Sequence, residues 1–348
     1  MLTAAKFPFM FVGAVVLSAF MSFGPKHLQP LTLSSQLASI GNGLAWSGGE
    51  STGLSPSAWQ SSGSGQNMPA AQSLSCQQAE PDGYQKCRYT DEFGQTMSFF
   101  LHVPAFGGPL QKYPLVLVLH GGGERASPGM TPAEGQAVLV RSPYVKCWVT
   151  KAAHLDEPSV QSRWPSFIVV PQLGDLSRWV DVPPGHGSYQ LAPRPTEELR
   201  MAKEVVDLLR QKYDDVDSNR LYITGISLGG YGTWDAIERW PNYFAAAVSV
   251  SGAGDPSRAS ELKDLPIWVF HGAGDPIVPV SGSRDMVQAI LAAGGQPRYT
   301  EYAGAKHDIW ARAYAVDTTS PSASLFQWLF SQHKGPANKL ARRDGAKG

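Results

Sequence analysis

The chain has few cysteines and no excess of charge of either sign. Only three cysteines occur in 348 residues, and none lies in a Cys–His cluster with the spacing of zinc ligands. The 29 basic and 29 acidic residues give a formal net charge of zero, so nothing indicates a basic surface for nucleic acid. We therefore expect no metal, no other cofactor and no nucleic-acid partner.

The first 24 residues have the composition of an export signal. Lys6 is followed by an uncharged apolar stretch, the order found in signal peptides. The stretch falls short of the roughly 20 apolar residues that a membrane-spanning helix needs. Residues 22–24 have the spacing of a cleavage site, but Pro25 follows and disfavours cleavage. We expect a cleaved signal peptide or an uncleaved anchor that tethers the protein to a membrane through residues 7–24; a mis-assigned start is the remaining alternative. Either export route makes the protein extracytoplasmic, that is, periplasmic or secreted.

Composition divides the rest of the chain into three parts. Residues 25–75 are dominated by Ser, Gly, Gln, Ala and Pro, and such a stretch buries too little apolar surface to offset the entropy of ordering. They are predicted to form a flexible linker. Residues 334–348 are basic and are predicted to be a disordered tail. The folded domain is expected over residues 76–333.

The cysteines leave one question open. Cys76 and Cys87 lie close in sequence and flank the turn-like segment PDG, so they either form a disulfide, as exported proteins often do, or stay reduced. Cys147 is then left over and is expected to be a small buried side chain.

Within the folded domain, short apolar segments alternate with amphipathic ones. Strands are predicted over residues 84–90, 96–104, 114–120, 167–172, 221–225, 245–252, 266–272 and 298–304. Helices are predicted over residues 196–213, 280–293 and 320–332, with Thr196 as the cap of the first. Continuous apolar strands that alternate with helices predict an α/β fold: a mostly parallel, doubly wound sheet with helices on both faces. The opening hairpin is expected to add antiparallel strands at one edge.

The stretch ITGISLGGYGTWDA places one serine among glycines, between a strand and a helix. A nucleophilic serine must project from a sharp strand-to-helix turn, and this turn requires neighbours without side chains. Gly225 and Gly229 supply that room, and Gly230 lets the helix pack on the sheet. Ser227 is therefore the candidate nucleophile.

Ligands bind at the carboxyl ends of the strands in open α/β sheets, so residues that follow other strands are its candidate partners. His307 follows the last strand and is predicted to be the base. Asp275 is the predicted acid that orients it, and Asp255, after the preceding strand, is the rival. The backbone N–H of Leu228 is the first expected oxyanion donor, and that of Gly122 or Gly123 is the second.

Other polar and aromatic residues follow the same strands. His120 and His271 precede glycine turns and are expected to stabilise them. Glu124 either lines the site or bonds its own loop, and the second role is preferred. Trp234 is predicted to be core. Trp179 and Trp310 either wall a substrate pocket or pack in the interior.

Four blocks carry a family resemblance: LVLVLHGGGER, RLYITGISLGGYGTWDAIERWPNYFAAAVSVSGAGD, DLPIWVFHGAGDPIVPVSGSRDMV and YTEYAGAKHDIW. The chain resembles the α/β-hydrolase superfamily over most of residues 95–332. Within it, the chain is similar to the bacterial "predicted peptidase" group, akin to polyhydroxybutyrate-depolymerase-like and feruloyl-type esterases. The resemblance implies a sheet of about eight strands, no cofactor and a Ser227–Asp275–His307 triad. The less patterned segment 126–165 lies between two strands and is expected to shape the pocket.

Together these observations predict an exported serine hydrolase that cleaves a small-molecule or polymer-linked carboxylic ester through an acyl-enzyme. Two alternatives stay open. One is a peptidase of the prolyl-oligopeptidase type, which is disfavoured because only about 75 residues, predicted to be mostly disordered, precede the domain. The other is a binding module without catalytic activity on the same fold.

Overall fold

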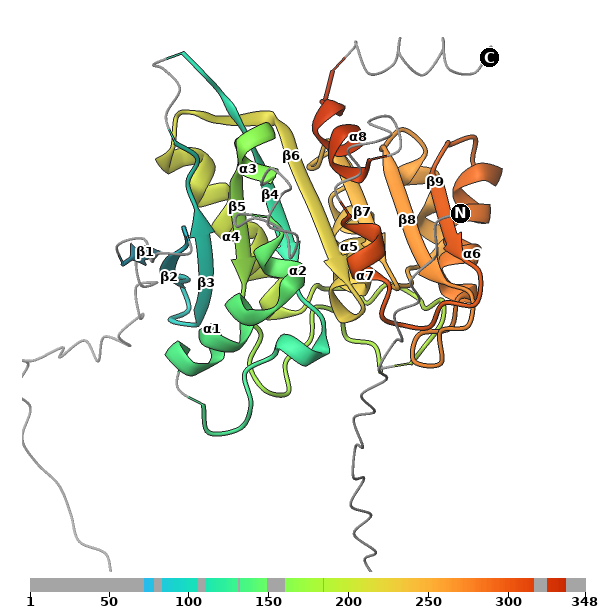
Figure 1. Ribbon diagram of the computed structural model, residues 1–348, viewed down its shortest axis with the longest axis horizontal. Coiled ribbons are helices and arrows are strands. Elements are labelled where there is room, and N and C mark those ends of the chain that lie inside the picture. Colours follow the sequence, from blue (N-terminus) through green and yellow to red (C-terminus); the bar gives the residue numbers. More distant parts are fainter. Residues whose placement is uncertain are drawn as a thin grey trace, which may run out of the picture. The chain divides into compact units, whose positions relative to one another are not determined.

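Nine strands form one sheet in the part of the chain that the structure describes, in the order β1-β2-β3-β5-β4-β6-β7-β8-β9 (Figure 1). The computed structural model describes residues 72–77, 83–105, 110–130, 132–148, 160–183, 185–315 and 324–335. The strands are β1 (Ser73–Cys76), β2 (Gln85–Thr90), β3 (Thr96–His102), β4 (Tyr113–Leu119), β5 (Phe167–Pro171), β6 (Val216–Ile226), β7 (Ala246–Val250), β8 (Ile267–Gly272) and β9 (Arg298–Tyr302).

The sheet is parallel from β5 through β4 and β6 to β9, and antiparallel from β1 to the β3–β5 pair. The predicted α/β class and the antiparallel edge are therefore confirmed. The sheet has one strand more than the eight apolar segments indicated. The additional strand, β1, has the sequence SLSC and a half-exposed pattern, so no apolar run marks it.

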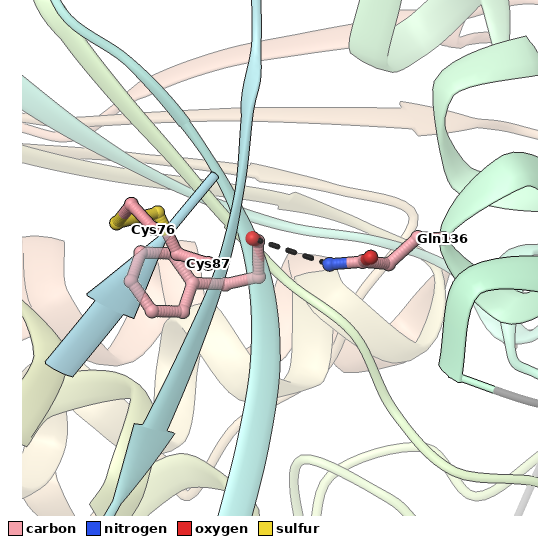
Figure 2. The surroundings of a disulfide bond; sticks show 4 residues. Cys76, Cys87 and Gln136 are labelled. Atoms are coloured by element: carbon pink, nitrogen blue, oxygen red, sulfur yellow. Dashed lines mark hydrogen bonds between the residues drawn. A yellow bond between two sulfur atoms is a disulfide. The ribbon is translucent and has the colours of Figure 1, made fainter. Parts of the chain in front are cut away.

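A disulfide joins the first strand to its neighbour. Cys76 and Cys87 face each other in the β1–β2 register and form the bond (Figure 2). On the other side of the hairpin, the side-chain amide of Gln136 donates to the carbonyl of Phe99 in β3 at 3.4 Å. Because β1 begins at Ser73, the folded domain starts three residues before the predicted boundary at residue 76.

The remaining domain predictions concern the two ends of the chain. The signal segment 1–24, nearly all of the linker and residues 336–348 lie outside the described residues. At the other end, Lys334 belongs to the fold rather than to a free tail. Its N–H donates to the carbonyl of Asn219 at 2.9 Å and its Nζ to the carbonyl of Tyr243 at 3.0 Å. Among the described helices, none combines the length and apolarity needed to cross a bilayer.

Helices cover both faces of the sheet, and a separate apolar core fills each side. One core packs α4 (Glu197–Lys212), α5 (Leu228–Arg239) and α6 (Ser281–Ala292) on strand residues such as Leu117 and Ile223. The other core packs α1 (Pro132–Arg141), α2 (Pro143–Lys146), α3 (Val160–Arg163), α7 (Trp310–Ala313) and α8 (Leu325–Ser331) on the alternate strand residues. The remaining described elements are two short 3-10 helices, η1 (Gly122–Glu124) and η2 (Pro256–Leu262). Burial on both faces explains why all of β4 is apolar and buried.

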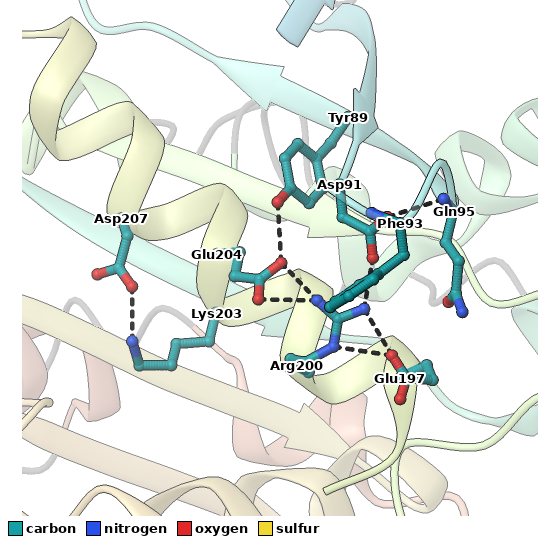
Figure 3. Close-up of polar contacts among 9 residues, drawn as sticks. All are labelled: Tyr89, Asp91, Phe93, Gln95, Glu197, Arg200, Lys203, Glu204 and Asp207. Atoms are coloured by element: carbon teal, nitrogen blue, oxygen red, sulfur yellow. Dashed lines mark hydrogen bonds and ion pairs between the residues drawn. The ribbon is translucent and has the colours of Figure 1, made fainter. Parts of the chain in front are cut away.

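Helix α4 also ties the antiparallel edge to the rest of the sheet. Its cap is Thr196, as predicted, whose side chain accepts from the N–H of Leu199 at 3.2 Å. The guanidinium of Arg200 then reaches Asp91, which follows β2, and also pairs with Glu197 and Glu204 on its own helix (Figure 3). This edge is therefore held by charge as well as by apolar contact.

Candidate active site

Ser227 lies between β6 and α5 with φ 52° and ψ −116°. Its N–H donates to the carbonyl of Val250 at 2.8 Å, which fixes the turn to β7. The flanking glycines are required by close backbone approach. A Cβ on Gly225 would overlap the carbonyl of Gly229, and a Cβ on Gly229 would overlap the carbonyl of Leu119. The glycines therefore permit the strained turn that projects Ser227, as the sequence predicted.

The structure brings Ser227, His307 and Asp275 into one hydrogen-bonded chain. Nε2 of His307 lies 2.8 Å from Oγ of Ser227, and Nδ1 of His307 lies 2.7 Å from Oδ2 of Asp275. Because the Asp275 carboxylate can only accept, the His307 proton belongs on Nδ1, and Nε2 is free to accept the Ser227 proton. The imidazole is nearly buried, with 9% of His307 exposed. A base and its orienting acid are therefore in place beside a hydroxyl.

The carboxylate of Asp275 is bonded on both oxygens. Its Oδ1 accepts from the N–H groups of Ile277 and Val278 at 2.8 and 2.9 Å. Its Oδ2 faces His271 at 3.2 Å in addition to His307. Burial alone would raise the pKa of Asp275, but these hydrogen bonds, led by that from His271, outweigh it and hold the pKa well below its usual range. The group is therefore ionised across the neutral pH range.

Asp255, the rival acid, serves a different purpose. Its Oδ1 accepts from the N–H and the hydroxyl of Ser257 at 3.0 and 2.7 Å, and its Oδ2 accepts from the N–H of Leu191 at 2.8 Å. These bonds cap η2 and hold the loop before α4. Asp275, rather than Asp255, is the acid in contact with His307.

The glycine run after β4 packs directly against the serine turn. A Cβ on Gly121 would lie 3.4 Å from the Ile226 side chain, and Gly229 approaches the carbonyl of His120. Gly122 and Gly123 open the one-turn segment η1, where Nε of Arg125 donates to the carbonyl of Gly122 at 3.2 Å. Leu228 is the first residue of α5, so its N–H has no partner within the helix. The candidate oxyanion donors thus lie on two adjoining segments, the start of α5 and the start of η1.

His120 stabilises its turn, as predicted. It is fully buried, its Nδ1 donates to the carbonyl of Gly121 at 2.7 Å, and its Nε2 accepts from the N–H of Leu173 at 3.0 Å. Burial lowers the pKa of His120 to about 4. A neutral imidazole with both nitrogens occupied is not available as a base. The Glu124 carboxylate does not bond its own loop; it accepts the hydroxyl of Ser142, which precedes α2, at 2.9 Å.

Of the two tryptophans predicted as pocket walls, Trp179 does not fit that role. It is fully buried, and its indole N–H donates to the carbonyl of His120 at 3.0 Å. Gly232 of α5 packs against its Cβ. A side chain without accessible surface cannot wall an open pocket, so Trp179 is a core residue that supports the His120 turn. Trp234 is also fully buried, as expected.

Trp310 lies differently. Its side chain is half-buried, and its ring meets the His307 imidazole edge to face at 5.6 Å between centroids, with an interplanar angle of 86°. It is therefore the predicted aromatic residue that contacts the candidate site.

Sequence reasoning gave His271 only a turn-stabilising role and did not consider Ser251. The spacing HGAGD places His271 four residues before Asp275, which is a signal that a turn could bring the two together. The hydroxyl of Ser251 donates to the backbone carbonyl of His307 at 3.2 Å. Nothing in the sequence SVSG around Ser251 distinguishes it from an ordinary strand end.

A doubly wound sheet with a serine elbow at the centre and an acid and a histidine after later strands defines an α/β-hydrolase. The chain has the α/β-hydrolase fold. Residues 196–268 match the prolyl oligopeptidase family. The solved structure described as "Crystal Structure of a Thermostable Esterase" is 34% identical with a TM-score of 0.57, over 73% of this chain and 64% of that one.

A second relative comes from Neocallimastix patriciarum. The "Bifunctional acetylxylan esterase/xylanase XynS20E" of that organism is 23% identical over 169 residues, which are 48% of this chain and 23% of the relative. The chain thus spans less than two thirds of the length of either relative.

Proposed function

We propose that the protein is a serine hydrolase that cleaves carboxylic esters through an acyl-enzyme intermediate. The observation that carries the proposal is the continuous contact from Ser227 through His307 to Asp275, at 2.8 and 2.7 Å. A serine hydroxyl is a weak nucleophile at neutral pH unless an adjacent base takes its proton, and this arrangement supplies the base and its counter-charge.

In this mechanism, Oγ of Ser227 attacks the ester carbonyl carbon while its proton passes to Nε2 of His307. The carbonyl oxygen becomes an oxyanion that accepts N–H groups from Leu228 and from Gly122 or Gly123. Collapse breaks the bond to the alcohol oxygen, which takes the proton from His307. Water then attacks the acyl-enzyme in the same way, releasing the carboxylic acid and restoring the Ser227 hydroxyl. The ionised Asp275 stabilises His307 each time it carries two protons.

Esters are the favoured substrates because the two relatives are described as esterases. The substrate is taken to be a small-molecule or polymer-linked ester. Trp310 is the proposed wall of its pocket because its ring lies beside the His307 imidazole. A peptidase is the second candidate, and the match of residues 196–268 to the prolyl oligopeptidase family favours it.

Export is part of the same proposal. The disulfide between Cys76 and Cys87 supports an oxidising compartment, since such bonds are rare in reducing cytosol. Together with the signal-like composition of the first 24 residues, it favours a periplasmic or secreted enzyme, or one held by an uncleaved anchor. Cell fractionation with an antibody to the folded domain distinguishes these sites, and a purely cytosolic signal contradicts export.

Labelling by a fluorophosphonate probe and turnover of p-nitrophenyl acetate test the chemistry. We expect Ser227 to be labelled, and Ser227→Ala to lose labelling and at least about four decades of kcat. Ser331→Ala, at the end of α8, is the matched control and keeps both. A folded wild-type protein without labelling or turnover contradicts the proposal and supports a binding module.

The substrate class is tested by a panel of short-chain esters, methyl ferulate, acetylated xylan, polyhydroxybutyrate and a peptide amide. Faster cleavage of the amide than of every ester replaces the esterase with the peptidase.

A further inference from the structure

The oxygen of Asp275 that faces His307 also faces a second, buried histidine. We propose that His271 is a positioning residue for the reaction, which holds the Asp275 carboxylate in the orientation that His307 requires. The proposal rests on the function proposed above and adds a residue that acts through the acid rather than on the substrate.

The surroundings of His271 determine which nitrogen carries a proton. The residue lies in β8 and is fully buried. Its Nε2 is 3.1 Å from the carbonyl of Val278 and 3.2 Å from Oδ2 of Asp275. Both partners can only accept, so Nε2 must be the donor. Its Nδ1 faces the hydroxyl of Ser283 at 2.7 Å, and that hydroxyl lies 3.0 Å from the carbonyl of Gly252.

The turn between His271 and Asp275 is held tightly. A Cβ on Gly272 would overlap the carbonyl of Lys306, so the backbone beside His271 packs against the turn that precedes His307. The Asp275 carboxylate consequently receives two backbone N–H groups on one oxygen and two imidazoles on the other. Four donors fix its rotation about the carbon–carbon bond, whereas three leave Oδ2 with a single partner.

Loss of the Nε2–H donor has a directional consequence. With one fewer donor, more negative charge on Oδ2 faces His307, and a carboxylate with more available charge stabilises a neighbouring imidazolium more strongly. The acid limb of the kcat/KM profile, which reports the essential base of the free enzyme, then moves to higher pH. Less restricted rotation of the carboxylate lowers kcat, while KM changes little because His271 does not touch the substrate.

The other titratable groups near His271 do not change protonation state in the pH range where the acid limb of the kcat/KM profile is measured. Glu301 of β9 pairs in register with His271, and hydrogen bonds from Arg284 and Tyr299 lower its pKa to about 2. Burial, followed by the charge of Asp275, raises the pKa of Tyr231 on α5 to about 12. Both groups keep one protonation state between about pH 5 and pH 9.

The pH dependence of kcat/KM for p-nitrophenyl acetate tests the proposal in full-length variants. His271→Leu removes the donor, and we expect its acid limb about 0.5–1 pH unit above that of the wild type, with kcat about tenfold lower and KM within about twofold. In His271→Gln the amide nitrogen can reach the position of Nε2, so the wild-type profile should largely return. Ser283→Ala is the control that removes the contact on the opposite nitrogen; it should lower the melting temperature but leave the pH profile in place.

A second comparison does not depend on the folding of the leucine variant. The amide of His271→Asn reaches only the Ser283 side, so this variant should show the shifted profile while His271→Gln does not. Coincident profiles for these two variants, or a wild-type profile for folded His271→Leu, overturn the positioning role. Failure of the proposed function is separate, because it appears as absent fluorophosphonate labelling of the wild type.

Discussion

The hydroxyl of Ser251 donates a hydrogen bond to the backbone carbonyl of His307 at 3.2 Å. Ser251 directly follows β7 and has φ 51°; among the described residues, only it and Ser227 are non-glycine residues with a positive φ. Its N–H donates to the carbonyl of Phe270 at 2.9 Å, so its backbone is held between β7 and β8. The strained conformation aims the hydroxyl at the turn that carries the candidate base.

Ser251→Ala tests this link. Removing the hydroxyl leaves the His307 carbonyl without that donor, and we expect kcat to fall about three- to tenfold with KM unchanged, as for the loss of one hydrogen bond. Ser251→Gly loses the same bond but tolerates the positive φ, so it should be about 1 kcal/mol more stable than the alanine variant. Steady-state kinetics and urea unfolding measure the two effects. Wild-type kcat in both variants would show that the His307 turn does not depend on Ser251.

Variants of Asp275 and Asp255 test directly which aspartate orients His307. Asp275→Asn replaces the carboxylate on Nδ1 of His307 and stabilises the wrong tautomer, so we expect a loss of about four decades in kcat. Asp255→Asn keeps one acceptor oxygen, which serves Ser257 or Leu191 but not both, so the melting temperature should fall while kcat stays within about twofold. The opposite order of activities would make Asp255 the acid.

Much of this site followed from chain order. Parallel strands end at one edge, so residues after β6, β8 and β9 had to lie close together, and the glycines around Ser227 identified the elbow. Trp179 could not be placed in this way, because its burial depends on a contact with Gly232 from a different part of the chain. His271 and Ser251 were not assigned their contacts because each acts through a turn whose geometry the sequence does not encode locally.

The fold predictions also succeeded where the sequence carries a local signal and failed where it carries none. Apolar runs such as β4 predicted the buried strands because burial on both faces leaves a continuous signal. The edge strand β1 carries no such signal and is held by pairing with β2 and by the disulfide. The anchoring of Lys334 was missed for a similar reason, because it depends on carbonyl groups of Asn219 and Tyr243.

The charge cluster at the hairpin edge should contribute strongly to stability (Figure 3). The side chain of Asp91 is fully buried and accepts from Arg200 at 2.5 Å, and from the N–H groups of Phe93 and Gln95. Asp91→Asn leaves the partly buried guanidinium without its most buried partner, and we expect a loss of about 2–4 kcal/mol in the free energy of unfolding. Glu197→Gln is the matched control: its side chain is 55% exposed, so the loss should stay below about 0.5 kcal/mol. Similar losses in urea unfolding of the two variants would contradict a special role for burial.

The buried neutral His120 predicts how stability depends on pH. Its pKa is about 4 in the folded protein against an ordinary value of 6.5, so the unfolded chain binds the proton first as the pH falls. The contribution of His120 is therefore fully present above pH 6.5 and is lost as the pH drops toward 4, by up to about 3 kcal/mol at pH 4.

Urea unfolding of the wild type and of His120→Gln at pH 7 and pH 4.5 measures this loss. The glutamine variant is expected to be less stable at pH 7, because Gly121 and Leu173 lose well-placed partners, but its free energy of unfolding should fall less between the two pH values. Carboxylates such as Asp275 and Asp91, whose pKa values are lowered in the folded protein, destabilise both proteins alike in acid. Their effect cancels in the difference, so parallel curves for the two proteins would mean that His120 can become protonated without unfolding the turn beside the serine.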